Sequence, residues 1–210
     1  MKLWLVTVAI LSTIFGVVAC APKAQNDCGY VQNVYGERIS WKGRLPIELS
    51  VHESFPTDKD DALKTAIKTW NESAGREVFR LKSTTRVKGP LTPMKDRENV
   101  LYYYDETKTE TSWEADKTSE QARTSVYWVG DLIQEADIRV NGMFHFYTLA
   151  TTDQSDGKVN MEALLIHELG HVLGLKHKDE GGSVMATYLA ESTERTKISD
   201  ADLQALRCEY

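Results

Sequence analysis

The chain has 210 residues, of which 41% are hydrophobic and 27% charged, and its net charge at pH 7 is -6. This size and composition are typical of one globular domain that can bury its own core, and the sequence contains no repeat or low-complexity segment. The acidic balance argues against nucleic acid as a partner. We therefore expect a single folded domain that acts as a monomer.

The N-terminus has the layout of an export signal. Lys2 precedes an unbroken run of apolar and small residues that ends at Ala19, which is typical of a secretory signal over residues 1–19 and too short for a full membrane span. The run ends in Val-Val-Ala-Cys, which resembles a bacterial lipobox, where Cys20 becomes the lipidated first residue of the mature chain. Ordinary cleavage after Ala21 is the alternative. The protein is therefore expected to be exported, either as a lipoprotein of the cell envelope or cell surface, held to the membrane only through Cys20, or as a secreted soluble protein.

The first half of the domain is predicted to contain short strands and one helix. Residues 20–37 are polar and are expected to act as a tether ahead of the domain at 38–210. Asp58 to Ala74 has the apolar period of a helix, with Thr57 as a candidate N-cap and Trp70 on the buried face. Gly75 is expected to end that helix. Alternating or β-rich segments predict strands at 45–51, 78–81 and 100–104.

The segment after the third strand is harder to place. Residues 105–124 contain no aliphatic residue larger than alanine and predict a long surface excursion or a frayed helix. Trp113 is conspicuous within it, and one hypothesis is that this segment overhangs a cleft and that Trp113 contacts the substrate. The tyrosines at 102–104 are expected to be structural, packing on one face of the strand and meeting water on the other.

A hairpin and a final helix complete the predicted elements. Residues 125–128 and 133–140 read as two strands joined at a turn around Gly130. Ser199 followed three residues later by Asp202 gives a credible capping box for a final helix.

Residues 167–177 read HELGHVLGLKH, in the pattern H-E-x-x-H-x-x-G-x-x-H. On a helix, His167 and His171 lie one turn apart on the same face, so both can direct a ring nitrogen at one metal ion. Gly174 can adopt the left-handed conformation that ends the helix and returns His177 to the same ion. Three imidazoles leave a fourth tetrahedral position open for water, which is the arrangement of one catalytic zinc ion and not of a closed structural site.

Glu168 lies beside the same point without forming an i, i+4 pair with either histidine. A carboxylate in that place suits a general base acting on a zinc-bound water. The sequence therefore predicts a zinc-dependent endopeptidase. One alternative is a non-catalytic surface lipoprotein stabilised by zinc, although a structural site has no use for Glu168. Another is a hydrolase of narrow specificity that acts on cell-wall peptides.

These residues resemble the metzincin zinc proteases, and within them the matrixins, which include the matrix metalloproteinases. Met185, in Ser183-Val184-Met185, is similar to the family's turn methionine, and Ala136-Asp137-Ile138 is similar to a matrixin strand. The resemblance covers roughly residues 38 to 210. It implies an α+β, zincin-like fold with a twisted mixed sheet of about five strands, three helices and an active-site helix. Met185 would form an apolar floor beneath the zinc.

The resemblance also implies how a protein or peptide substrate binds. In matrixins, the edge strand that lines the cleft pairs with the extended substrate, and residues 145–150 are the expected counterpart here. The residues after Met185 depart from the family: matrix metalloproteinases have a proline two residues after the turn methionine and a tyrosine two residues further on. Here Thr187 stands at the proline's position, and Tyr188 lies one place before the position of the tyrosine. Lys178 likewise replaces a common serine. The residues that bind substrate therefore stay unknown.

Cys28 and Cys208 are a pair near the two ends of the domain in an oxidising compartment, and a disulfide is the simplest expectation. The resemblance supports it, because the mature N-terminus of matrixins packs against the last helix. The rival interpretation makes Cys28 an inhibitory thiolate on the zinc, as in the propeptides of matrix metalloproteinases. Gly29 fits that motif, whereas Asp27 and Tyr30 do not match it.

Matrix metalloproteinases hold a second zinc and calcium ions in an insertion that would fall between residues 138 and 160, and this chain is short there. His52 and His145 have no ligand partner at a useful spacing. We therefore expect no structural zinc. Calcium is possible but unproven, and the candidate ligands are Asp137, Asp153 and Asp156.

Overall fold

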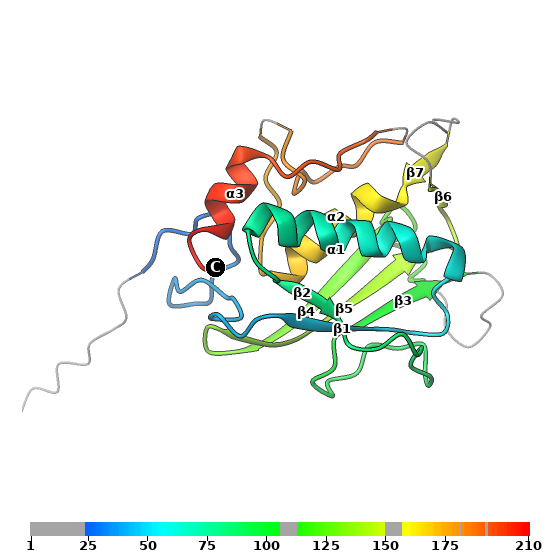
Figure 1. Ribbon diagram of the computed structural model, residues 1–210, viewed down its shortest axis with the longest axis horizontal. Helices are drawn as coiled ribbons and strands as arrows, with labels where there is room; N and C mark the ends of the chain where they lie inside the picture. The colour runs from blue at the N-terminus through cyan, green and yellow to red at the C-terminus, as the bar shows by residue number, and fades with distance from the viewer. Residues whose placement is uncertain (1–23, 106–112, 150–156, 181, 192) are drawn as a thin grey trace, which may run out of the picture.

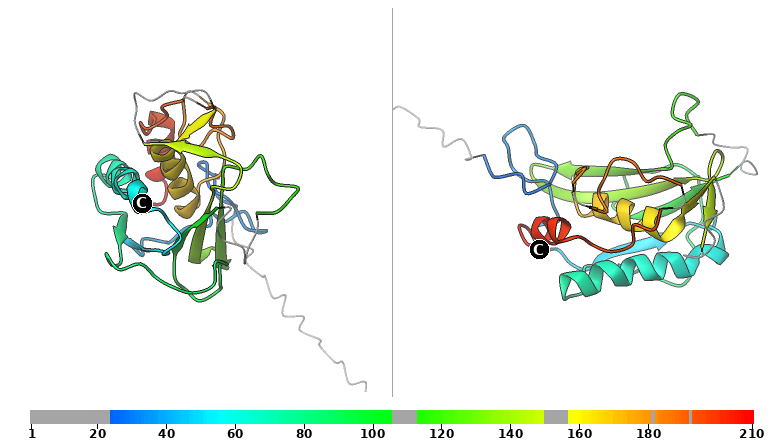
Figure 2. Two further views of the ribbon diagram at one scale, coloured as in Figure 1. Left: turned by 90° about the vertical axis from the view of Figure 1, so that its right-hand side faces the viewer. Right: turned by 90° about the horizontal axis from the view of Figure 1, so that it is seen from above.

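The computed structural model describes residues 24–105, 113–149, 157–180, 182–191 and 193–210. The expected signal at 1–19, Cys20, Asp153 and Asp156 lie outside these described residues. Five strands form one mixed sheet, and two long helices lie together on one of its faces (Figure 1). Figure 2 shows the same two layers from the side and from above. The predicted α+β class, with a mixed sheet of five strands and three helices, is confirmed.

The sheet has the strand order β2-β1-β3-β5-β4. Neighbouring strands in it run parallel to each other, except that β4 pairs antiparallel with β5. Parallel neighbours need a crossover connection, and α1 (Asp60–Ala74) supplies the one between β1 and β2. The antiparallel pair is the predicted hairpin, and it places β4 at the edge. The strands are β1 (Ile47–Val51), β2 (Phe79–Leu81), β3 (Val100–Tyr104), β4 (Ala122–Val129) and β5 (Leu132–Asn141).

The start of α1 differs from the prediction, and its end agrees with it. Thr57 is not an N-cap, because it lies inside a 3-10 turn, Thr57–Lys59, that leads into the helix. The residue before the helix is Lys59, whose side chain makes no capping hydrogen bond. Gly75 ends the helix in the left-handed conformation, with φ of 67°.

The second long helix, α2 (Met161–Val172), is the core of the domain, since all of its residues except Glu162 and His171 are buried. Two tryptophans donate hydrogen bonds to its backbone from other elements: Trp70 Nε1 to the carbonyl of Ile166 at 2.9 Å, and Trp41 Nε1 to that of Val172 at 2.8 Å. The prediction that Trp70 is a core residue is confirmed. The side chains of α2 are therefore held by a fixed frame.

The outer face of the sheet, away from the helices, carries a second small core. All five residues of β3 are buried, so the expectation that its tyrosines meet water on one face is wrong. Tyr102 and Tyr104 pack there with residues from outside the sheet, Leu91 and Trp113. The segments around β3 therefore cover a face that the strand's own sequence does not identify as buried.

Trp113 belongs to this outer core, which contradicts the hypothesis that it contacts substrate. Its side chain is 2% exposed and meets Tyr104 edge to face, with 5.8 Å between ring centroids. The guanidinium groups of Arg123 and Arg139 lie 5.7 and 5.3 Å from its ring. Glu114 forms an ion pair with each arginine. The tryptophan is enclosed on the face of the sheet opposite the helices.

Residues 145–150 were expected to form the strand that lines the cleft, and this expectation is wrong. The described part of that segment contributes β6 (Phe146–Thr148), which pairs with β7 (Lys158–Asn160) in a separate two-stranded sheet. The main sheet has β2 and β4 as its edge strands, and β4 is the edge strand that contacts α2.

The first described residues and the C-terminus lie on the same side of the domain, next to α3 (Asp200–Leu206) (Figure 1). A disulfide joins Cys28 to Cys208, with 6.4 Å between their Cα atoms, so Cys28 is not directed at the histidines. Tyr30 is buried and bridges to Leu175. Cys28 and Tyr30, which lie in the segment expected to be a tether, are therefore attached to the domain.

The predicted capping box of α3 is confirmed, with Ser199 and Asp202 exchanging hydrogen bonds. In the described part of the chain, each helix is too short or too polar to cross a membrane.

Removing the disulfide is expected to cost about 2–4 kcal/mol of unfolding free energy, because the bridge closes a long loop in the unfolded chain. The comparison is the Cys28→Ser/Cys208→Ser double variant against the oxidised wild type in urea unfolding. Reductant should lower the unfolding free energy of the wild type to that of the double variant, and it should leave the unfolding free energy of the variant unchanged. Equal stability with and without the bridge would contradict the expectation.

Candidate active site

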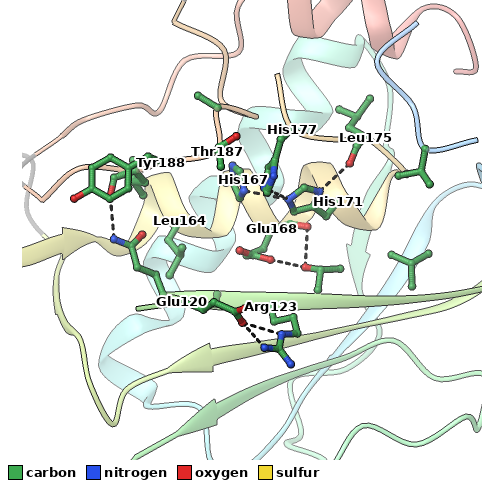
Figure 3. A pocket seen from close by; sticks show the side chains of 18 of the residues that line it. Glu120, Arg123, Leu164, His167, Glu168, His171, Leu175, His177, Thr187 and Tyr188 are labelled. Carbon is green, nitrogen blue, oxygen red and sulfur yellow. Dashed lines mark hydrogen bonds and ion pairs between the residues drawn. The ribbon is translucent and has the colours of Figure 1, made fainter. Parts of the chain in front are cut away.

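The motif of residues 167–177 spans the second half of α2 and the turn that follows it. His167, Glu168 and His171 lie on the helix and line a cleft, and His177 reaches the same cleft from beyond the helix (Figure 3). The turn needs a glycine at Gly174: its φ is 97°, and a Cβ there would lie 2.3 Å from the carbonyl oxygen of Ile39. The chain turns back at Gly174, as predicted.

The three histidines bring their Nε2 atoms together. His171 Nε2 lies 3.1 Å from Nε2 of His167 and 3.1 Å from Nε2 of His177. Nitrogens bound tetrahedrally to one zinc ion at about 2.0–2.1 Å would be separated by roughly 3.3 Å. Among the described residues, this is the group of three or more His, Cys, Asp or Glu side chains with ligand atoms close enough to hold a metal ion. The spacing therefore fits one zinc ion.

The hydrogen bonds of the rings fix which nitrogen can bind a metal. His167 Nδ1 lies 2.7 Å from the carbonyl oxygen of Val184, and His171 Nδ1 lies 2.8 Å from that of Leu175. A carbonyl oxygen only accepts, so each Nδ1 carries the proton and each Nε2 presents a lone pair. Lone pairs that converge at this distance repel each other unless a cation lies between them. The donor set thus fits a bound metal ion.

Burial keeps these rings neutral. It lowers the pKa of His167 to about 4 and that of His171 to about 4, because an imidazolium would lose its hydration there. Both rings are uncharged at neutral pH, and this is the form that binds a metal.

Glu168 lies on the floor of the cleft beside the histidines, with a side chain that is 3% exposed. Burial raises the pKa of its carboxyl group above the ordinary range for a glutamate. The hydroxyl of Thr124, on β4, donates to Glu168 Oε2 at 2.6 Å. This carboxyl group is therefore desolvated, oriented from the sheet, and adjacent to the histidine cluster.

The turn that carries Met185 lies under α2. Met185 is buried, and a Cβ on Gly170 would lie 2.2 Å from its sulfur atom, so the glycine makes room for it. Asp202 of α3 anchors this turn, because its carboxylate accepts from Ser183 Oγ at 2.5 Å and from the backbone N–H of Val184 at 3.0 Å. The same Val184 orients the ring of His167, so α3 supports the cluster indirectly.

The cleft has a volume of about 610 Å³. The edge strand β4 forms one wall, and residues 186–189 form the opposite wall. Gln121 Nε2 donates to the carbonyl of Leu189 at 2.9 Å and joins the two walls at one end. In the second wall, Thr187 donates to Asp179 from both its backbone and its hydroxyl. This wall contains the residues that depart from the family pattern, and it faces the histidines.

The sequence did not identify Thr124 or Gln121 as residues of this site. Asp202 was expected only to cap its helix, and its contact with the turn of Met185 was not foreseen. Each acts over a long separation in the chain, so no local pattern identifies it. One signal existed for Thr124: it is the polar member of an otherwise apolar alternation, Ala122, Thr124 and Val126.

Other candidate residues lie away from the cleft. His52 is buried near Gly89, and His145 Nε2 lies 3.0 Å from the carbonyl of Thr118. Asp137 is buried on β5, where its Oδ1 accepts from the N–H of Val100 at 2.9 Å. Burial raises the pKa of Asp137 to about 7. The structure does not bring these residues together with the histidine cluster.

An α+β domain with this histidine cluster, a buried glutamate on the same helix and a methionine turn beneath them has the architecture of a metzincin catalytic domain. The family model described as Matrixin matches residues 48–210, and the chain belongs to that family. Over 57 residues the chain is 40% identical to "Matrilysin" of Felis catus. That match covers 25% of this chain and 22% of the relative, so the chain spans about a fifth of that protein's length.

Proposed function

We propose that this protein is a zinc-dependent endopeptidase. The observation that carries the proposal is the convergence of three imidazole Nε2 atoms, in an open cleft, beside a buried carboxylate. A structural zinc site is closed by four protein ligands, whereas a catalytic site keeps a position for substrate or water. A cluster of three histidines at a cleft favours the second kind.

In this mechanism His167, His171 and His177 would hold the zinc ion through Nε2. When bound, zinc supplies Lewis acidity, which polarises the scissile carbonyl and makes water more acidic. Glu168 takes a proton from the attacking water and delivers it to the nitrogen of the leaving amine. Its burial suits this role, because a raised pKa makes the carboxylate a stronger base towards the attacking water.

The edge strand β4 is the proposed docking site for substrate. An edge strand offers unpaired backbone N–H and C=O groups, and an extended peptide can add to it as another strand. β4 lines the cleft beside Glu168. The substrate class proposed is therefore protein or peptide in an extended conformation.

The protein is proposed to work outside the cytoplasm. The disulfide between Cys28 and Cys208 supports this, because such bonds persist in oxidising compartments. Lipid anchoring through Cys20 stays part of the proposal, with a secreted soluble form as the alternative.

Metal removal tests the proposal directly. A peptide library incubated with the mature protein should be cleaved, a zinc chelator should abolish cleavage, and zinc added back should restore it. The subsite preference read from the products would separate a general endopeptidase from a narrow hydrolase of cell-wall peptides. A protein that binds one zinc per chain and cleaves no member of the library would instead favour the non-catalytic alternative.

A further inference from the structure

A polar residue on the inner face of β4 has no explanation in the packing of the strand. Ala122 and Val126, two positions to either side of Thr124, pack against the main hydrophobic core. All three residues line the cleft beside α2. Side chains alternate along a strand, so an apolar residue is also expected at Thr124. A buried hydroxyl group at this position needs a specific hydrogen-bond partner, because its burial without one would cost free energy.

That partner is Glu168. The Thr124 hydroxyl lies 2.6 Å from Glu168 Oε2 and 3.3 Å from the backbone carbonyl oxygen of the same residue. A hydroxyl has one proton to donate, and the shorter distance assigns it to the carboxylate. A hydrogen bond to an ionised group is stronger than one between neutral groups, and more so in a buried site. The contact therefore both stabilises and orients the carboxylate.

We propose that Thr124 is a positioning residue for Glu168. Its hydroxyl holds Oε2, which leaves Oε1 to exchange the proton with water and with the leaving amine. This inference rests on the proposed function. Its consequence is that one strand serves both partners of the reaction: the backbone of β4 receives the substrate, and the side chain of Thr124 sets the base. A shift of β4 would then move base and substrate together.

Packing alone is the competing explanation, since Thr124 stands between Ala122 and Val126, which both pack against the core. Thr124→Val separates the two, because valine keeps the β-branched shape and removes only the hydroxyl. Thr124→Ser makes the opposite change, keeping the hydroxyl and removing the methyl group. Thr65→Val is the matched control: Thr65 lies exposed on α1, where its hydroxyl donates to the Asp61 carbonyl at 2.8 Å.

The kinetic experiment compares these variants at full zinc occupancy. Thr124→Val should lower kcat by about 10- to 100-fold, the range expected for one hydrogen bond to a charged group. KM should stay within about twofold, since the substrate's own contacts are unchanged. Thr124→Ser should restore kcat to within about threefold of the wild type, and Thr65→Val should match the wild type. A Thr124→Val enzyme with wild-type kcat would overturn the proposal, and so would a serine variant as slow as the valine variant.

A measurement without activity keeps the test independent of the proposed function. In zinc-free protein labelled with ¹³C in its glutamate carboxyl groups, the Glu168 resonance should shift in Thr124→Val and return in Thr124→Ser. Glu168→Gln identifies that resonance. Thr124→Ala provides the same comparison if the valine variant does not fold. An unmoved resonance in the variant without the hydroxyl refutes the contact itself. A moved resonance in a protein that cleaves no peptide leaves the contact standing and refutes the proposed function instead.

Discussion

Glu168→Gln is expected to keep its zinc ion and to lose peptide cleavage by about 10²- to 10⁴-fold, the usual contribution of a general base. Glutamine has nearly the same shape as glutamate, so the buried position on α2 should tolerate it, and Thr124 can still donate to its amide oxygen. The amide group cannot take a proton from water at neutral pH. The loss should therefore fall on kcat, while KM changes little.

Glu162→Gln is the matched control for this variant, because Glu162 is the other glutamate of α2, lies in its first turn and does not line the cleft. Its kcat/KM should stay within about twofold of the wild type. The measurements are peptide cleavage under saturating substrate and zinc content per chain. Glu168→Gln that retains more than a tenth of wild-type kcat would contradict the role of Glu168 as the base. Loss of zinc in that variant would show instead that the carboxylate supports the metal site.

The centre of the site could be predicted because its geometry is local. His167 and His171 are brought together by the helical period alone, and Gly174 returns His177 over a few residues. The residues that tune the site are not local. Thr124 comes from a strand 44 positions before Glu168, and Asp202 reaches back 18 positions to Val184. Such pairs are set by how the sheet and α3 pack on α2, and no spacing in the sequence encodes that packing.

The fold shows the same division. Strand positions and the hairpin follow from alternation and from the turn at Gly130, which are short-range signals. The order of strands does not, so residues 145–150 were assigned to the cleft edge that β4 occupies. The burial of β3 on both faces was also missed, because the cover over Tyr102 and Tyr104 comes from Leu91 and Trp113 on separate segments. Which face of a strand is covered depends on those distant residues.

Trp113→Ala should destabilise the protein by about 3–5 kcal/mol, as expected when a fully buried aromatic residue is truncated. The loss includes the edge-to-face contact with Tyr104 and the stacking of Arg123 and Arg139 on the indole ring. Urea unfolding measures it. At low temperature, where the variant stays folded, kcat/KM should remain within a few-fold of the wild type, since Trp113 does not line the cleft.

Trp128 is the informative comparison, because it is the tryptophan that does line the cleft, at the far end of β4, with 46% of its surface exposed. Trp128→Ala should cost less than about 1 kcal/mol in stability and should raise KM, since an exposed aromatic side chain on the proposed docking strand contributes to substrate binding more than to folding. The same substitution is therefore expected to reduce stability at Trp113 and to raise KM at Trp128. If Trp113→Ala raised KM with unchanged stability, the segment around it would have to reach the cleft after all. The described contacts of Trp113 with Tyr104, Arg123 and Arg139 instead hold it in the outer core.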